Sequence, residues 1–157
     1  MIMNPLLTDI DYPAFIAITE QSPLGSSLNG ETLIAQTEAC KDWESRYRIL
    51  MQLGKQLPTF AKQYQQPNFE IHGCESQVWL VMIEYHGRYY FLAHSPARIV
   101  KGLLAALLAE LQGADREKIV AFSSQEYFQR LGLGKHLTPS RSNGLLAIIK
   151  AIKEVVC

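Results

Sequence analysis

The chain has 157 residues, with 15 basic and 15 acidic side chains and 48% hydrophobic residues. This length suits one domain with a real core, and the balanced charge gives no electrostatic footprint for nucleic acid. The longest apolar runs, residues 78–83 and 103–109, are far shorter than the roughly 18 to 20 residues that cross a bilayer. We therefore expect one domain that binds neither nucleic acid nor a membrane.

The three cysteines, Cys40, Cys74 and Cys157, are an odd number and include no Cys-x-x-Cys pair. This pattern argues against a disulfide framework and against a closed four-thiolate zinc site. Near the N-terminus, Asp9 and Asp11 stand where a secretory signal would carry positive charge. Together these features predict a protein of the reducing cytoplasm.

Residues 1–29 contain three prolines and a Gly-Ser-Ser segment, which exclude a long helix through this region. Residues 14–18 are apolar enough to dock locally on a core. We interpret residues 1–29 as an N-terminal extension of unassigned role and residues 30–157 as the functional domain.

Apolar residues recur at three- and four-residue steps from Cys40 through Trp43 to Leu50. This spacing is typical of one face of a helix and predicts a single helix over residues 31–53. Gly54 is expected to end that helix, because glycine is common just past the last helical turn. On this face, Cys40 is expected to pack in the core.

Strand patterns follow the helix. Apolar and polar residues alternate over residues 68–72, and residues 77–85 are largely apolar, so both segments are predicted strands. His86-Gly87 is typical of a hairpin turn, after which residues 88–93 return as a third, aromatic strand. We expect a three-stranded antiparallel meander with helices covering much of the sheet, because residues 78–83 are apolar on both alternating sides.

The C-terminal part of the chain has helical spacing. Helices are expected over residues 100–111, 115–122 and 125–131, and from Pro139 almost to Cys157. Thr138 followed by Pro139 is a strong start signal, a capping side chain before a proline at the first helical position. The predicted class is α+β, with a three-stranded antiparallel sheet packed by N-terminal and C-terminal helices.

The candidate functional residue is Cys74, which follows Gly73 at a tight turn between two predicted strands. Glycine makes a reversal sterically easy and places the cysteine on a loop tip, where a thiol reaches a partner. The alternative for any lone cysteine is a buried space-filler. Among its neighbours, His72 is a candidate for orienting or ligating, although a histidine ending a strand is more often structural. Cys157 is terminal and is expected to be exposed without a function.

The sequence around Cys74 resembles the active-cysteine motif of the SufE/CsdE family of sulfur acceptors. The motif reads Ile71-His72-Gly73-Cys74-Glu75-Ser76-Gln77-Val78-Trp79. Three further segments agree in order, at residues 43–47 with 53–58, at 99–103 and at 136–145. Four collinear motifs make this a specific resemblance over about residues 40–153.

The resemblance implies a compact α+β fold similar to the iron–sulfur scaffold protein IscU, with Cys74 on a loop that is sheltered at rest. It implies an accessory sulfur-transfer protein that partners a cysteine desulfurase and has no autonomous reaction. Cys74 would take the persulfide sulfur and pass it toward an iron–sulfur assembly scaffold. The fold needs no cofactor of its own, and pyridoxal phosphate belongs to the desulfurase.

Sulfur transfer needs a Cys74 thiolate that attacks the terminal sulfur of a persulfide. An unperturbed thiol titrates at about 8.5, so apolar shelter beside Glu75 is expected to lower the thiolate fraction further. Arg141, at the start of the last helix, is expected to lie near the loop and to stabilise it or the thiolate. A merely solvated Arg141 remains the alternative.

Two other functions are open. A metal or iron–sulfur scaffold would need several converging thiolates or histidines, and the sequence offers only Cys74 with His72 nearby. A non-catalytic binding module would make no use of the Cys74 thiol.

Overall fold

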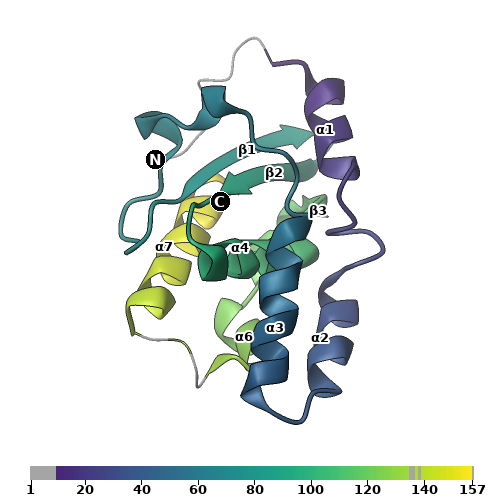
Figure 1. Cartoon of the computed structure of the whole chain (residues 1–157). Helices are drawn as coiled ribbons and strands as arrows, with labels where there is room; N and C mark the ends of the chain where they lie inside the picture. The colour runs from purple at the N-terminus through teal and green to yellow at the C-terminus, as the bar shows by residue number, and fades with distance from the viewer. Residues whose placement is uncertain (1–9, 135–136, 138, 157) are drawn as a thin grey trace.

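The structure of the chain is a computed structural model that describes residues 10–134, 137 and 139–156 (Figure 1). Helices surround a three-stranded antiparallel sheet, which confirms the predicted α+β class. The helices are α1 (Tyr12–Glu20), α2 (Gly30–Glu38), α3 (Trp43–Leu53), α4 (Arg98–Leu111), α5 (Arg116–Ala121), α6 (Ser124–Arg130) and α7 (Pro139–Val156). The strands are β1 (Trp79–Tyr85), β2 (Arg88–His94) and β3 (Ala114–Asp115).

The N-terminal region contains two helices where the sequence predicted one helix over residues 31–53. Helix α2 ends at Glu38, and α3 begins only after Asp42, whose carboxylate accepts a hydrogen bond from the Ser45 amide over 2.8 Å. Aspartate at this position satisfies a free N–H of the new helix and favours a fresh start over continuation. The single-helix prediction is therefore wrong. Gly54 follows the last residue of α3, as expected.

Strands β1 and β2 form the predicted hairpin. Trp79 pairs with His94 at one end of the ladder and Tyr85 pairs with Arg88 at the other. Between them, His86-Gly87 has φ angles of 52° and 80°. Two consecutive positive φ angles match the turn whose twist suits a two-residue hairpin.

The strand that completes the sheet beside the hairpin differs from the prediction. The expected strand over residues 68–72 is reduced to one bridge between Glu70 and Trp79. A 3₁₀ turn, η4 (Pro67–Phe69), occupies the start of this segment and leaves too little extended backbone for a ladder. The two-residue strand β3 instead pairs with the start of β2, so the sheet order is β1-β2-β3.

Both faces of the hairpin are buried, as the apolar pattern of β1 predicted. One face packs on α4 and the helices around it, through Val78, Leu80, Met82, Tyr89, Phe91 and Ala93. The other face is covered by α1 and by residues 60–69, in a second cluster of buried Phe15, Phe69, Trp79, Val81, Ile83 and Leu92. In Figure 1, α4 lies below the hairpin in the view and α1, in purple, lies beside it. Part of the N-terminal extension thus docks on the sheet.

Helix α4 is buried along almost its whole length because it packs against the sheet, α2 and α3 together. It packs tightly on α3 at Gly102, where an added Cβ would lie 2.5 Å from the Leu50 carbonyl oxygen. Gly54 lies against the backbone at Gly102, since a Cβ at Gly54 would lie 3.0 Å from the Gly102 nitrogen. Two glycines therefore set the distance between α3 and α4.

The three C-terminal helices agree with the sequence prediction. Asp115 caps α5 and Ser123 caps α6, each by accepting a hydrogen bond from a backbone amide in the first turn. The predicted cap of α7, Thr138, lies outside the described residues, as does Cys157. Within the part of the chain that the structure describes, none of the helices combines the length and the apolar character that a membrane span requires.

Replacing Phe15 with alanine tests whether α1 belongs to the folded unit. Phe15 is 3% exposed and packs with the sheet cluster, so Phe15→Ala should lower the free energy of unfolding by about 3 kcal/mol. Urea denaturation followed by circular dichroism measures this loss. Glu20→Ala, exposed on the same helix, is the control and should change stability by no more than about 0.5 kcal/mol. Equal midpoints for the two variants would contradict the prediction.

Candidate functional site

Cys74 lies in a short loop, residues 72–77, immediately before β1. The Ile71 amide donates a hydrogen bond to the Val78 carbonyl over 2.9 Å and closes the base of this loop. Gly73 has φ of 98°, an angle that glycine adopts without strain. The predicted glycine turn is therefore confirmed, and it directly precedes the cysteine.

A cavity of about 190 Å³ lies where the loop meets α4 and α7. Its apolar lining comes from the residue directly before β1 and from the two helices. It consists of Val78, Val100, Leu103, Leu104, Leu145 and Ile148. Cys74, Glu75, Ser76, Arg141 and Gly144 complete the lining. The cysteine thus borders a mostly hydrophobic chamber.

The Cys74 thiol is half-buried. Its Sγ lies 3.6 Å from the carbonyl oxygen of Gly144 in α7 and donates a hydrogen bond to it. Burial raises the pKa of the Cys74 thiol above its ordinary value, because the thiolate loses solvation there. Since the thiolate is the nucleophile, the resting site holds the cysteine in its less reactive form.

Two further predicted site residues, Glu75 and Arg141, line the same cavity as Cys74. Arg141 comes from the first turn of α7 and is half-buried, whereas Glu75 follows the cysteine on the loop and is exposed. Each makes other polar or electrostatic contacts as well. The structure therefore brings a thiol, a carboxylate and a guanidinium together from segments about 65 residues apart in the sequence.

His72 is exposed in the turn and does not line the cavity. Gly73 does not line it either, but a Cβ at Gly73 would lie 3.3 Å from the Ala147 Cβ, so the turn rests on α7. Sequence reasoning missed Gly144, which contacts Cys74 directly. Its position three residues after Arg141 was a usable signal, because residues three apart share a helix face.

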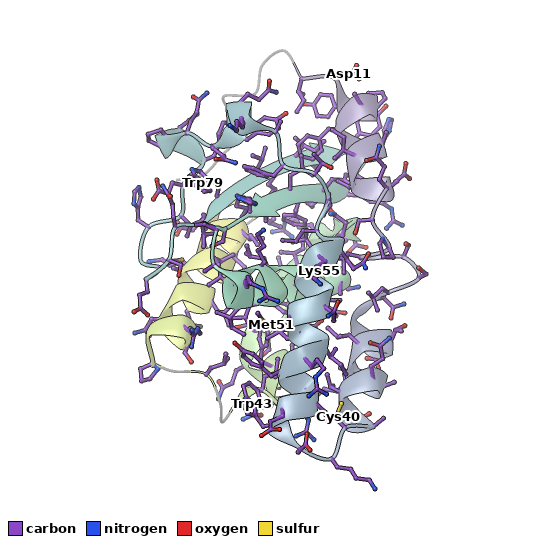
Figure 2. All side chains as sticks on the ribbon, in the orientation of Figure 1. Asp11, Cys40, Trp43, Met51, Lys55 and Trp79 are labelled. Carbon is purple, nitrogen blue, oxygen red and sulfur yellow. The ribbon has the colours of Figure 1, made fainter. Side chains whose placement is uncertain are left out.

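Cys40 is half-buried in the connection between α2 and α3, and its Sγ donates a hydrogen bond to the Gln36 carbonyl over 3.5 Å. The expected core position on a helical face with Trp43 is wrong, because the break before Asp42 removes Cys40 from the helix. Figure 2 shows Cys40 and Trp43 together at the lower end of this helical pair, well separated from Trp79 at the start of β1.

A scaffold function would require several ligands on one centre. Among residues 10–134, 137 and 139–156, no three His, Cys, Asp or Glu side chains lie close enough together to hold a metal ion. The described site presents Cys74 with Glu75 beside it, which is fewer ligands than an iron–sulfur cluster uses.

Comparison with known sequences matches the chain to a protein family and to a curated relative. Residues 31–156 match the family model of the SufE Fe-S metabolism associated domain. The chain is also 40% identical to the sulfur acceptor protein CsdE of Escherichia coli (strain K12) over 131 residues, which cover 83% of this chain and 89% of that protein.

Among solved structures, the chain is similar to a hypothetical protein from Thermus thermophilus whose structure was determined in solution. The TM-score is 0.64, with 21% sequence identity, and the match covers 86% of this chain and 94% of the other. At this identity the structural likeness supports the fold alone.

The raised pKa of Cys74 predicts a shifted pH profile for its reaction with iodoacetamide. The rate should rise at a higher pH than for an ordinary thiol of pKa about 8.5, because only the thiolate reacts and burial disfavours it. Peptide mass spectrometry of timed samples from about pH 6 to 10 measures the rate at Cys74, since this range brackets the ordinary thiol value. The same peptide labelled in urea is the control, and a native midpoint at or below the unfolded one would contradict the prediction.

Proposed function

The chain belongs to the SufE family, and from this membership we propose that it accepts sulfur from a cysteine desulfurase in Fe-S metabolism and carries it as a persulfide on Cys74. The observation that carries the residue assignment is the position of Cys74, on a glycine turn at the edge of a mostly apolar cavity. The other described cysteine, Cys40, lies at the far end of the helical pair and lines no part of this cavity.

In the proposed reaction, the Cys74 thiol loses its proton to solvent and the thiolate attacks the terminal sulfur of a persulfide on the desulfurase. The bond between the two donor sulfurs breaks, and the donor cysteine leaves as a thiolate. Cys74 gains one sulfur atom, and no external oxidant or reductant is consumed, because this is thiol exchange with a shared sulfur.

The resting geometry implies that the partner has to change the Cys74 environment. The sulfur is half-buried against α7 and its pKa is raised by burial, so few molecules carry a thiolate at neutral pH. Docking of the desulfurase would move the loop of residues 72–77 away from α7 and expose the sulfur to solvent. The closed loop protects the protein from unproductive reactions between encounters.

Arg141 is the residue that we propose to assist the transfer, by stabilising the loop or the thiolate as charge develops on Cys74. It lines the same cavity from the first turn of α7. Glu75 and Gly73 shape the loop around the cysteine, and His72, exposed on the turn, is assigned a structural role.

The proposal needs no cofactor on this chain, since the desulfurase supplies the persulfide through its own pyridoxal phosphate. Cys74 would then pass the sulfur to an iron–sulfur assembly scaffold in the cytoplasm, without a nucleic-acid or membrane partner. The equal numbers of acidic and basic residues support the expected absence of a nucleic-acid partner.

The Cys74→Ser variant tests the acceptor role. After incubation with a cysteine desulfurase and cysteine, the wild-type Cys74 peptide should gain one or more sulfur atoms by mass spectrometry, and the serine variant should gain none. Cys40→Ser is the matched control and should load like the wild type. If no desulfurase loads Cys74 or responds to the protein, a binding module becomes the better account, and metal bound after purification would favour a scaffold.

The Arg141→Ala variant tests the assisting charge. We expect the rate of sulfur loading on Cys74 to fall by about 5- to 10-fold, because a hydrogen bond or ion pair to a charged group is worth about 1 kcal/mol or more. Arg141→Lys should recover part of the rate, since it restores the charge. Arg48→Ala removes an exposed arginine on α3 and serves as the control. Wild-type loading in Arg141→Ala would exclude the assigned role.

A further inference from the structure

The sulfur of Cys74 rests directly on the backbone of α7. A Cβ atom added at Gly144 would lie 3.5 Å from Cys74 Sγ, 3.6 Å from its Cα and 3.7 Å from its Cβ. These are ordinary contact distances, so a methyl group would touch the cysteine on three atoms and a larger side chain would occupy its place. Gly144 therefore leaves open the position that the cysteine fills.

The contact between Cys74 and Gly144 is also polar. The thiol has one hydrogen, and it points to the Gly144 carbonyl oxygen over 3.6 Å. The remaining walls near the sulfur are mainly apolar, and the charged groups that line the same cavity are Glu75 on the loop and Arg141 on α7. The hydrogen bond to Gly144 is thus a contact that the thiol makes and that a sulfur without a hydrogen does not make.

Adding a sulfur atom removes this hydrogen bond. In a persulfide, Sγ is bonded to Cβ and to the second sulfur, so it carries no hydrogen whether the terminal sulfur is protonated or not. Its lone pairs would then face the lone pairs of the Gly144 carbonyl oxygen at the same distance. A thiolate cannot donate this hydrogen bond either, since its sulfur also lacks a hydrogen.

The loop is built to separate from α7 without disturbing the sheet. Its base is closed by the hydrogen bond between Ile71 and Val78, and the β1–β2 ladder begins beyond that point. Between these ends, Gly73 has a positive φ and touches α7 through Ala147. A rearrangement of residues 72–77 that lifts Cys74 from Gly144 would therefore leave the ladder in place.

We propose that Gly144 is a positioning residue whose carbonyl makes the closed site selective for the Cys74 thiol, so that sulfur loading itself weakens the closed loop. This inference rests on the proposed function and concerns the regulation of the same site. The empty protein keeps Cys74 against α7, whereas the loaded protein spends more time with the loop open. Loading would thereby present the sulfur for onward transfer, and its removal would let the loop close again.

Hydrogen–deuterium exchange of residues 72–77 tests the proposal without any desulfurase. A Cys40→Ser, Cys157→Ser variant is loaded at Cys74 with inorganic polysulfide, whose terminal sulfur is transferred to the thiolate while the shortened polysulfide leaves. Mass spectrometry confirms one added sulfur atom. Loss of a weak hydrogen bond should raise the exchange rate of the loop amides by roughly 3- to 10-fold relative to the unloaded protein.

The control for polysulfide treatment is the same protein with Cys74→Ser, which keeps an O–H donor and accepts no sulfur; its loop should exchange at one rate before and after treatment. If loading leaves the exchange of residues 72–77 unchanged or slows it, the terminal sulfur is held inside the cavity and the proposal is overturned. Because the sulfur donor is inorganic, this outcome is independent of whether a desulfurase loads Cys74.

Substitutions at Gly144 give a second, independent test. Gly144→Leu should displace the thiol and speed iodoacetamide labelling of Cys74 about 10-fold or more, whereas Gly144→Ala should slow it by adding contacts in the closed state. Leu146→Ala, on the exposed side of α7, is the control and should not alter labelling. Circular dichroism checks that each variant is folded. Wild-type labelling rates in both Gly144 variants would overturn the positioning role.

Discussion

Helix α4 is the constraint on which the other elements depend. Its residues from Gly102 to Ala109 are all buried, so the sheet, α2 and α3 are needed to cover it. A helix that is apolar nearly all round is stable only inside a shell of other elements. The same helix also supplies Val100, Leu103 and Leu104 to the wall of the Cys74 cavity. The close contact of Gly102 with Leu50 fixes α4 against α3, and the site is therefore built on a closely packed part of the core.

The sequence predicts the elements whose signals are local. The helical spacing of α4, the apolar run of β1 and the aromatic run of β2 extend over many residues, and each of these elements is confirmed. The predictions fail where a single hydrogen bond or a tertiary contact, which the hydrophobic pattern does not contain, determines the backbone. One capping carboxylate, Asp42, divides the predicted helix in two. Strand β3 has only two residues and no hydrophobic pattern of its own. Just before it in the chain, the side-chain amide of Gln112 accepts a hydrogen bond from the Phe91 N–H and donates one to the Phe91 carbonyl. Such an arrangement depends on tertiary contacts that a linear pattern does not contain.

The candidate site divides in the same way. Cys74 and its glycine turn were predictable because the turn is specified by adjacent residues, and the four motifs pointed to the same cysteine. Arg141, at the start of the last helix, was expected near the loop, and it lines the same cavity as Cys74. The contact with Gly144 joins residues 70 positions apart in the chain. Glycine has no side chain whose chemistry indicates a role, so the spacing from Arg141 was the one available signal, and the contact itself is seen only in the packing of the loop on α7.

A sulfur carrier has to combine shelter with release, and the energies of this site suit that combination. The contacts that hold the sulfur of Cys74 include one long S–H···O hydrogen bond, and such a bond contributes little beside the roughly 5–15 kcal/mol that stabilises a typical domain. The hydrogen bond between Ile71 and Val78 closes the base of the loop, so an opening of residues 72–77 would leave the cavity walls from α4 and α7 in place. Burial disfavours the thiolate in the closed state, and exposure restores it. The proposed movement of the loop would therefore change the position and the reactivity of Cys74 together.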